Sequence, residues 1–352
     1  KVEGNIKGLG TTIALVTGGT NSKNKTFFRL ILVWKGKFSF NVNLNEPGGG
    51  RIISRNMFFK RASGKPLWMR SKSIDFSLSH NEHIFIEGEM KQYSIDYTIK
   101  GNILSEQASQ FRKQNLSILE HETRTQLLLD SLTFQNTNKQ LIDTTHALFD
   151  GIRKHYNNQR LEYVKANPSF EIAAKYLQSQ DKDTIIKYFP LLTEKVRQTQ
   201  EGRLLQERIV AWTQVEVGKP APLFTSTTID GKIFNLSNFK GKYIVLDFWG
   251  SWCGPCTSGF PKMKEYYSKY KNKLEFVGIA CRDKEADWKK AVGKYGLQWT
   301  QLLNNEKYSL ATKYAVEVYP TKILIDKEGK LIQLFQGESS EFYQKLDELF
   351  NR

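Results

Sequence analysis

Cysteine and histidine are scarce in this chain of 352 residues, and their distribution narrows its chemistry. Three cysteines are too few for a scaffold held together by disulfides. The five histidines all precede residue 216. A zinc site usually takes about four Cys or His ligands, and covalent haem attachment takes a histidine directly after a cysteine pair, where this chain has Thr257. We therefore expect no metal and no cofactor.

Long apolar runs are also missing. The longest candidates, such as LILVW at 30–34, have the length of a strand, whereas a membrane-spanning helix needs about 18 apolar residues or more. The chain starts at Lys1, without a methionine and without the apolar segment of a signal peptide. We therefore expect no membrane-spanning helix, and a targeting segment that has been removed.

Acidic residues are absent between Pro47 and Ile74, in a chain whose formal net charge is +16. Seven basic residues lie in this segment: Arg51, Arg55, Lys60, Arg61, Lys65, Arg70 and Lys72. Such a patch can bind anionic lipid, glycan or nucleic acid. No nucleic-acid-binding motif accompanies it, so we favour the solvated face of a strand-rich segment and expect no nucleic-acid partner.

The first part of the chain, residues 1–104, has the pattern of β-strands. In YSIDYTIKG the side chains of Tyr93, Ile95, Tyr97 and Ile99 alternate with polar residues, which is the period of a half-buried strand. Turn signals rich in glycine separate such runs. This pattern predicts an antiparallel, sandwich-like β domain.

Glycine and proline are then absent from 102 to 150, which favours helices. We expect a helical middle region over 105–215. A cluster of Gly218, Pro220 and Pro222 marks a boundary. Residues 216–352 alternate between short strands and helices, so the sequence predicts a multidomain α+β protein with a C-terminal α/β domain around a central sheet.

The segment FWGSWCGPC ends at Cys256 and holds two cysteines one helical turn apart. It overlaps the apolar run KYIVLDFWG, typical of a strand covered on both faces, so a helix should begin at Cys253. A helix N-terminus stabilises a thiolate over a thiol. Pro255 suits a first turn, where its missing N–H has no helical partner. We therefore favour a redox dithiol, with Cys253 facing outward, Cys256 inward and Trp252 beside the sulfur.

Other cysteine chemistries fit these residues less well. A peroxidatic cysteine would have a proline seven residues and a threonine three residues before it, but this chain has Leu246 and Gly250 there. The third cysteine, Cys281, ends an apolar strand-like run. Buried inert thiols are common, so we favour a structural role for it; a reactive thiol is the alternative.

Residues 216–352 resemble the thioredoxin-like thiol–disulfide oxidoreductases, in particular the exported TlpA/ResA group. This resemblance implies that the central sheet of the domain is mixed. Asp247 lies six residues before Cys253, where thioredoxin keeps a buried aspartate, and Pro261 matches the proline of its active-site helix. The matching segments are VLDFWGSWCGPC, VYPT at 318–321 and APLFTSTTIDGKIFNLSNFKGK, which looks like the hairpin that this group adds. The layout of residues 1–215 and fragments such as VEGNIKGL at 2–9 resemble bacterial envelope proteins with a DUF4369 domain.

This resemblance implies exchange between a dithiol and disulfide-containing protein substrates. Cys253 would attack, and Cys256 would resolve the mixed disulfide and close a Cys253–Cys256 disulfide. Asp247 would take the proton of Cys256. The Tyr319–Pro320 bond is expected to be cis, which leaves the Tyr319 backbone free to pair with an extended substrate.

The Gly254–Pro255 dipeptide matches that of thioredoxin, which lies at the reducing end of the dithiol scale. The resemblance therefore implies a reductant, exported to the periplasm or anchored in the envelope as a lipoprotein, and kept reduced by a membrane thiol donor of the DsbD type. Gly259, Val318 and Tyr319 depart from the group, which commonly has a glutamate at the first position and smaller residues at the other two.

Two alternatives stay open at this point. One is an envelope protein that binds a partner or ligand and uses the thioredoxin fold as a scaffold; an intact CGPC motif with Trp252, Asp247 and Pro320 argues against it. The other is a disulfide oxidase or isomerase. The sequence leaves the oligomeric state open.

Overall fold

The structure is a computed structural model, which describes residues 1–18, 27–42, 48–79, 81–136, 138–304 and 310–351. The chain divides into two compact units, Lys1–Leu205 and Gln206–Arg352. Among the described residues, none of the helices combines the length and the apolar character that crossing a bilayer requires. The domain bounds 1–104, 105–215 and 216–352 stay predictions.

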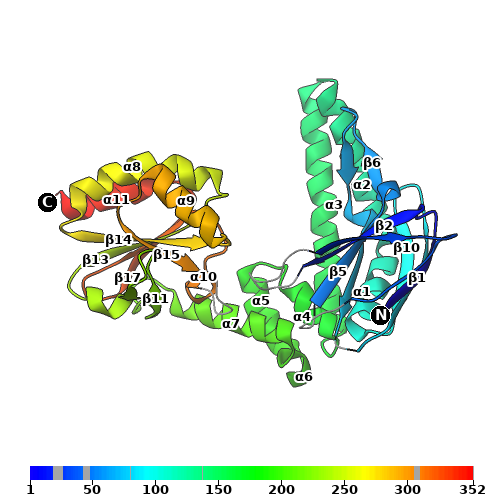
Figure 1. Cartoon of the computed structure of the whole chain (residues 1–352), viewed down its shortest axis with the longest axis horizontal. Coiled ribbons are helices and arrows are strands. Elements are labelled where there is room, and N and C mark those ends of the chain that lie inside the picture. Colours follow the sequence, from blue (N-terminus) through cyan, green and yellow to red (C-terminus); the bar gives the residue numbers. More distant parts are fainter. Residues whose placement is uncertain (19–26, 43–47, 80, 137, 305–309, 352) are drawn as a thin grey trace. The chain divides into compact units, whose positions relative to one another are not determined.

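The first unit begins with a strand-rich region (Figure 1). Its strands are β1 (Val2–Lys7), β2 (Thr12–Gly18), β3 (Phe27–Leu32), β4 (Lys37–Phe40), β5 (Gly48–Ile53), β6 (Phe58–Lys60), β7 (Pro66–Trp68), β8 (Ile74–Leu78), β9 (Ile84–Met90) and β10 (Ile95–Lys100). They form one sheet in the order β10–β9–β1–β4, a second in the order β3–β2–β5–β8, and the hairpin β6–β7.

A single apolar core joins these two sheets. It contains Ile6 of β1, Ile13 of β2, Ile52 of β5 and Ile95 of β10, all buried. Residues from both sheets in one core confirm the predicted sandwich-like arrangement. The pairing of β1 with β9 is parallel, however, so the sheets are not purely antiparallel. The chain leaves β1, passes through the other sheet and returns, and such a crossover permits a parallel neighbour.

The helices of the middle region follow directly. They are α1 (Ile103–Gln114), α2 (Leu116–Phe134), α3 (Lys139–Ala166), α4 (Glu171–Leu177), α5 (Lys182–Tyr188), α6 (Glu194–Arg197) and α7 (Gln200–Gln214). Asn102 caps α1 by accepting a hydrogen bond from the Ser105 N–H at 2.9 Å. The long helices α2 and α3 lie side by side (Figure 1). The predicted helical middle region is therefore confirmed.

Several basic residues of the segment 47–74 have partners within the first unit. Three of its arginines pair with carboxylates: Arg51 with Asp75 at 2.6 Å, Arg61 with Asp130 at 3.4 Å and Arg70 with Glu122 at 2.5 Å. Lys72 is buried, and its ammonium lies 4.5 Å from the centre of the Phe59 ring. Arg55, Lys60, Arg61 and Lys65 are exposed, in line with a solvated face, whereas Lys72 is buried and departs from that interpretation. The helices that follow in the sequence supply two of the acidic partners.

The second unit contains a mixed sheet in the order β15–β14–β13–β16–β17. Its strands are β11 (Thr225–Thr227), β12 (Ile233–Asn235), β13 (Tyr243–Trp249), β14 (Leu274–Cys281), β15 (Thr300–Asn304), β16 (Thr321–Ile325) and β17 (Leu331–Gln336). Its helices are α8 (Gly254–Tyr270), α9 (Glu285–Tyr295), α10 (Leu310–Lys313) and α11 (Ser340–Phe350). β13 is parallel to β14 and antiparallel to β16, which confirms the predicted mixed sheet.

Apolar cores cover both faces of this sheet. One core holds Val245 and Trp249 of β13 together with residues of α8, α9 and α11. The other holds Leu246 and Phe248 of the same strand, the hairpin β11–β12 and the region of α10 (Figure 1). Alternate residues of a strand point to opposite faces, so Asp247 shares a face with Val245 and Trp249, beneath the three helices. The two-sided burial explains why KYIVLDFWG is nearly continuous in apolar residues.

Candidate active site

The two cysteines of the CGPC motif lie at the start of α8, directly after the central strand β13. Cys253 is the residue that caps the helix, and its Sγ accepts a hydrogen bond from the Cys256 N–H at 3.3 Å. Pro255 occupies the first turn, as expected. The Sγ atoms of Cys253 and Cys256 are 2.01 Å apart and form a disulfide. The helix N-terminus thus directs its N–H groups and positive dipole end at the Cys253 sulfur.

Both cysteines are covered in this structure, with exposures of 5% for Cys253 and 3% for Cys256. The prediction that Cys253 faces outward is therefore wrong for the oxidised chain. Both sulfurs belong to the apolar core under α8, and Tyr319 packs against that core. Trp252, which is half exposed, meets the Tyr319 ring edge-on at 5.6 Å between centroids. Aromatic side chains therefore adjoin the dithiol.

Trp252 is held in place by the loop that enters α8. Its indole N–H donates to the Cys281 carbonyl at 3.1 Å. A Cβ on Gly250 would lie 2.5 Å from the indole nitrogen, so only glycine leaves room for the ring. The buried carboxylate of Asp283 accepts from the Ser251 N–H at 2.7 Å. Asp283 was not foreseen from the sequence, because it lies on another strand–helix loop.

The segment that precedes β16 lies beside Trp252. The Tyr319–Pro320 peptide bond is cis, as expected from the VYPT segment. Pro320 is buried and Tyr319 partly so. Thr321, the first residue of β16, donates its hydroxyl to the Val318 carbonyl at 2.7 Å. Val318 itself is 48% exposed, so an apolar side chain is open to solvent on this loop.

Asp247 is buried on the face of β13 that lies under α8, with an exposure of 1%. Its flanking neighbours on that face, Val245 and Trp249, share the core that contains both cysteines. Burial disfavours the charged carboxylate and raises the pKa of Asp247 to about 6. The nearby Lys322 ammonium acts in the opposite direction. A carboxyl with this pKa can exchange a proton near neutral pH.

A buried lysine faces Asp247 from the neighbouring strand. Lys322 of β16 is the register partner of Asp247, and its Nζ lies 3.8 Å from Asp247 Oδ1. The same Nζ donates to Glu338 Oε2 at 2.8 Å. Glu338 Oε1 accepts from the Tyr343 hydroxyl at 2.8 Å. Lys322 and Glu338 were missed from the sequence; the available signal was a lysine inside the strand-like run TKILI.

Cys281 lies in the core on the opposite face of the sheet and is fully buried. Burial raises the pKa of its thiol to about 12. Asn304 donates a hydrogen bond to its Sγ at 3.5 Å. This thiol is therefore protonated at neutral pH and shielded from reagents, in line with a structural role.

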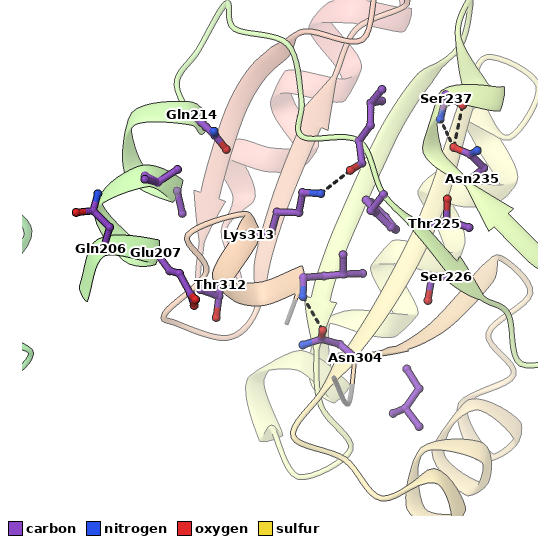
Figure 2. Close-up of a pocket in the computed structure, with 16 residues that line it drawn as sticks. Gln206, Glu207, Gln214, Thr225, Ser226, Asn235, Ser237, Asn304, Thr312 and Lys313 are labelled. Carbon is purple, nitrogen blue, oxygen red and sulfur yellow. Dashed lines mark hydrogen bonds between the residues drawn. The ribbon is translucent and has the colours of Figure 1, made fainter. Parts of the chain in front are cut away.

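The second unit also has a pocket of about 870 Å³ (Figure 2). Its polar lining residues are Gln206, Glu207, Gln214, Thr225, Ser226, Asn235, Ser237, Asn304, Thr312 and Lys313. Lys313 Nζ donates to the Leu223 carbonyl at 2.6 Å, and Asn304 Oδ1 accepts from the Leu310 N–H at 2.7 Å, so these polar groups are engaged in the fold. Neither cysteine of the disulfide is among the described lining residues. The pocket is therefore separate from the candidate active site.

Comparison with known proteins points to the same region of the chain. The AhpC/TSA family model matches residues 217–334. The thiol-disulfide oxidoreductase ResA of Bacillus thuringiensis subsp. konkukian is 37% identical over 140 residues, which cover 40% of this chain and 79% of ResA. ResA of Bacillus subtilis is 32% identical over 128 residues, which cover 36% of this chain and 71% of that protein.

Part of the chain is also similar to solved structures. A thiol-disulfide oxidoreductase from Bacteroides fragilis matches with 29% identity and a TM-score of 0.35, over 38% of this chain and 100% of that one. Residues 217–334, which the family model matches, contain the Cys253–Cys256 disulfide and have a thioredoxin-like fold. Through its C-terminal domain the chain belongs to the ResA-type thiol–disulfide oxidoreductases.

Proposed function

We propose that this protein is a reductant of protein disulfides that works through Cys253 and Cys256. The observation that carries this proposal is the position of Cys253 Sγ, which caps α8 and accepts the Cys256 N–H. In the reduced protein the same N–H groups and dipole stabilise a Cys253 thiolate, which is the attacking form of the thiol.

The reaction has two exchange steps. The Cys253 thiolate attacks a disulfide sulfur of the substrate, a mixed disulfide forms and one substrate thiolate leaves. Cys256 passes its proton to Asp247 and attacks Cys253 Sγ, which breaks the mixed disulfide and releases the second substrate thiol. Asp247 returns its proton and water supplies a second, so the substrate gains two electrons and two protons and the enzyme is left with the Cys253–Cys256 disulfide.

Trp252, Tyr319 and Pro320 support substrate binding in this proposal. The half-exposed Trp252 and the exposed Val318 offer apolar contact area beside the disulfide. The Tyr319 backbone precedes β16 and would pair with an extended substrate segment by strand addition. Gly254 and Pro255, both exposed in the first turn of α8, would lie against the substrate chain.

We further propose an exported protein in the periplasm or anchored to the envelope, where a membrane thiol donor of the DsbD type returns two electrons to the disulfide after each turnover. Residues 1–104 are proposed to be a DUF4369-like domain and 105–215 a helical connector. The substrates in this proposal are proteins with accessible disulfides. Nucleic acid has no part in it.

The test is the reduction potential of the Cys253–Cys256 pair, measured by equilibrating the full chain in graded glutathione buffers and counting free thiols. A value near that of thioredoxin, about −270 mV, supports a reductant. A value near that of DsbA, about −120 mV, would instead make the protein an oxidase or isomerase. Absence of a reversible two-electron couple would leave only a binding scaffold.

A further inference from the structure

The buried Lys322 is the least expected group near the disulfide. It is 1% exposed in a strand whose other residues are Thr, Ile and Leu. Burying an ammonium is costly unless charged or polar partners compensate for the lost water. Its partners therefore indicate why a lysine stands here, in register with Asp247.

Lys322 lies between two carboxylates, but its Nζ is at different distances from them. Its Nζ is at hydrogen-bond distance, 2.8 Å, from Glu338 Oε2. It is 3.8 Å from Asp247 Oδ1, which is beyond a hydrogen bond. Asp247 Oδ1 has no hydrogen-bond partner among the described residues. Glu338 thus holds the ammonium close enough to Asp247 to act through its charge, yet not as a donor to it.

The Glu338 carboxylate is itself fixed from two sides. The Tyr343 hydroxyl of α11 donates to its Oε1 at 2.8 Å, while its Oε2 accepts from Lys322. The carboxylate also lies against Gly259 of α8, where a Cβ would come within 2.5 Å of it. The helix that carries both cysteines therefore approaches Glu338 at a position that only glycine leaves open.

We propose that Lys322 and Glu338 are positioning residues for the resolving step, in which Glu338 holds the Lys322 ammonium away from Asp247 and so leaves that carboxyl free to accept and return the proton of Cys256. This inference rests on the role of Asp247 in the proposed function. A direct Lys322–Asp247 hydrogen bond would favour the carboxylate strongly and would make it a weaker base towards a thiol.

The charged and titratable groups that face Asp247 come from several elements. On β16 there is Lys322, in the segment before α11 there is Glu338, and on α11 there is Tyr343. On α8 there are the two cysteines, which share its core. The β14 residue in register with Asp247 is a glycine and adds no charge.

Two neutralising variants distinguish this arrangement from a merely structural one, because the proposal requires opposite shifts. Glu338→Gln removes a negative charge and frees Lys322 to bind Asp247, so the Asp247 titration should move to lower pH. Lys322→Met removes the positive charge and keeps an apolar stem of similar length, so the titration should move to higher pH. Charges at this distance shift the pKa of a carboxyl by about one unit or more.

A third variant tests the geometry without changing any charge. Gly259→Ala should push the Glu338 carboxylate away from Lys322 and shift the Asp247 titration in the same direction as Glu338→Gln. Alanine also favours the helix over glycine, so loss of folding is not expected. The matched control is Gly293→Ala in α9, where an added Cβ meets no atom within 4 Å; it should leave the titration unchanged.

Asp247 is titrated directly by 13C NMR of the full chain labelled at the aspartate carboxyl carbons, with Asp247→Asn to assign the signal. The resolving step is followed in the reduced chain with Ellman's reagent. Attack by Cys253 releases one coloured thiolate, and resolution by Cys256 releases a second. The pH midpoint of the second release should shift with the Asp247 titration in each variant.

Opposite shifts in Glu338→Gln and Lys322→Met, seen in both measurements, support the proposal. Shifts of the same sign, or no shift in Glu338→Gln and Gly259→Ala, would overturn it, even if Lys322→Met failed to fold. Failure of the proposed function has another signature, because the wild-type chain would then release no second thiolate at any pH.

Discussion

The side-chain amide of Gln301 lies directly over Gly278. A Cβ on Gly278 would be 2.4 Å from Gln301 Oε1, and the two residues are register partners in β14 and β15. On the other side of Gly278, the residue in register with it is Asp247 of β13. Gln301 is 1% exposed, and neither its amide nitrogen nor its oxygen has a hydrogen-bond partner among the described residues. A Cβ at position 278 would therefore force the buried Gln301 amide out of its place.

Gly278→Ala is expected to destabilise the second unit by about 1–3 kcal/mol, the usual cost of an added methyl in a packed core. Gly293→Ala, the control on an exposed helix, should stabilise it by up to about 1 kcal/mol. The urea concentration at which Cys281 becomes reactive to a maleimide in the oxidised chain reports on this unit. Equal midpoints in the two variants would contradict the close contact.

Cys281 should be inert in the folded protein. Burial raises the pKa of its thiol to about 12, so roughly one molecule in ten thousand carries the thiolate at pH 8. The oxidised chain should bind no maleimide in buffer and one equivalent in urea, whereas Cys281→Ala should bind none in either. Labelling of the native oxidised chain would show that this thiol is accessible.

The two cysteines of the disulfide should fail in different ways when they are replaced. Cys256→Ser keeps the attacking thiol, so a mixed disulfide with the substrate should accumulate and be visible by non-reducing electrophoresis. Cys253→Ser should form none. Both should lose turnover by roughly a thousandfold or more, since residues that act as one unit fail together. Accumulation in Cys253→Ser instead would exchange the two proposed roles.

Stability should depend on the protonation of Asp247. Burial raises the pKa of Asp247 from 3.8 to about 6, so between these values the folded chain keeps a proton that the unfolded chain has lost. The free energy of unfolding therefore falls as pH rises through this window, by about 3 kcal/mol in total. Asp247→Asn removes this dependence.

The measurement for Asp247 is the difference in free energy of unfolding between Asp247→Asn and the wild-type chain, taken from urea titrations at pH 4 and pH 7. The variant should gain on the wild type by roughly 2 to 2.5 kcal/mol over this range, most of the total. A difference that stays constant with pH would mean that Asp247 does not titrate there.

Local sequence patterns were enough for the elements that carry the dithiol. The apolar run KYIVLDFWG and the CGPC turn predicted β13 and the start of α8 within one or two residues, because apolar runs and helix-start signals act over short distances.

Features that depend on distant segments were not predictable in this way. The exposure of Cys253 was predicted wrongly, because the aromatic Tyr319 that packs on its core arrives 66 positions later in the chain. The parallel pair β1–β9 was missed, since a strand's pattern does not name its neighbour. The pairing of Arg70 with Glu122 likewise joins a strand-rich and a helical region whose local patterns say nothing of each other.

The sequence by itself therefore determined where the dithiol stands and which chemistry it can perform, because the CGPC motif, the preceding apolar strand and the helix start are contiguous. Only the tertiary structure decided the electrostatic environment of Asp247. A strand, a loop and a helix that are distant in sequence supply Lys322, Glu338 and Gly259, and these elements meet only in the folded domain. Burial there makes electrostatic interactions stronger than they would be in water.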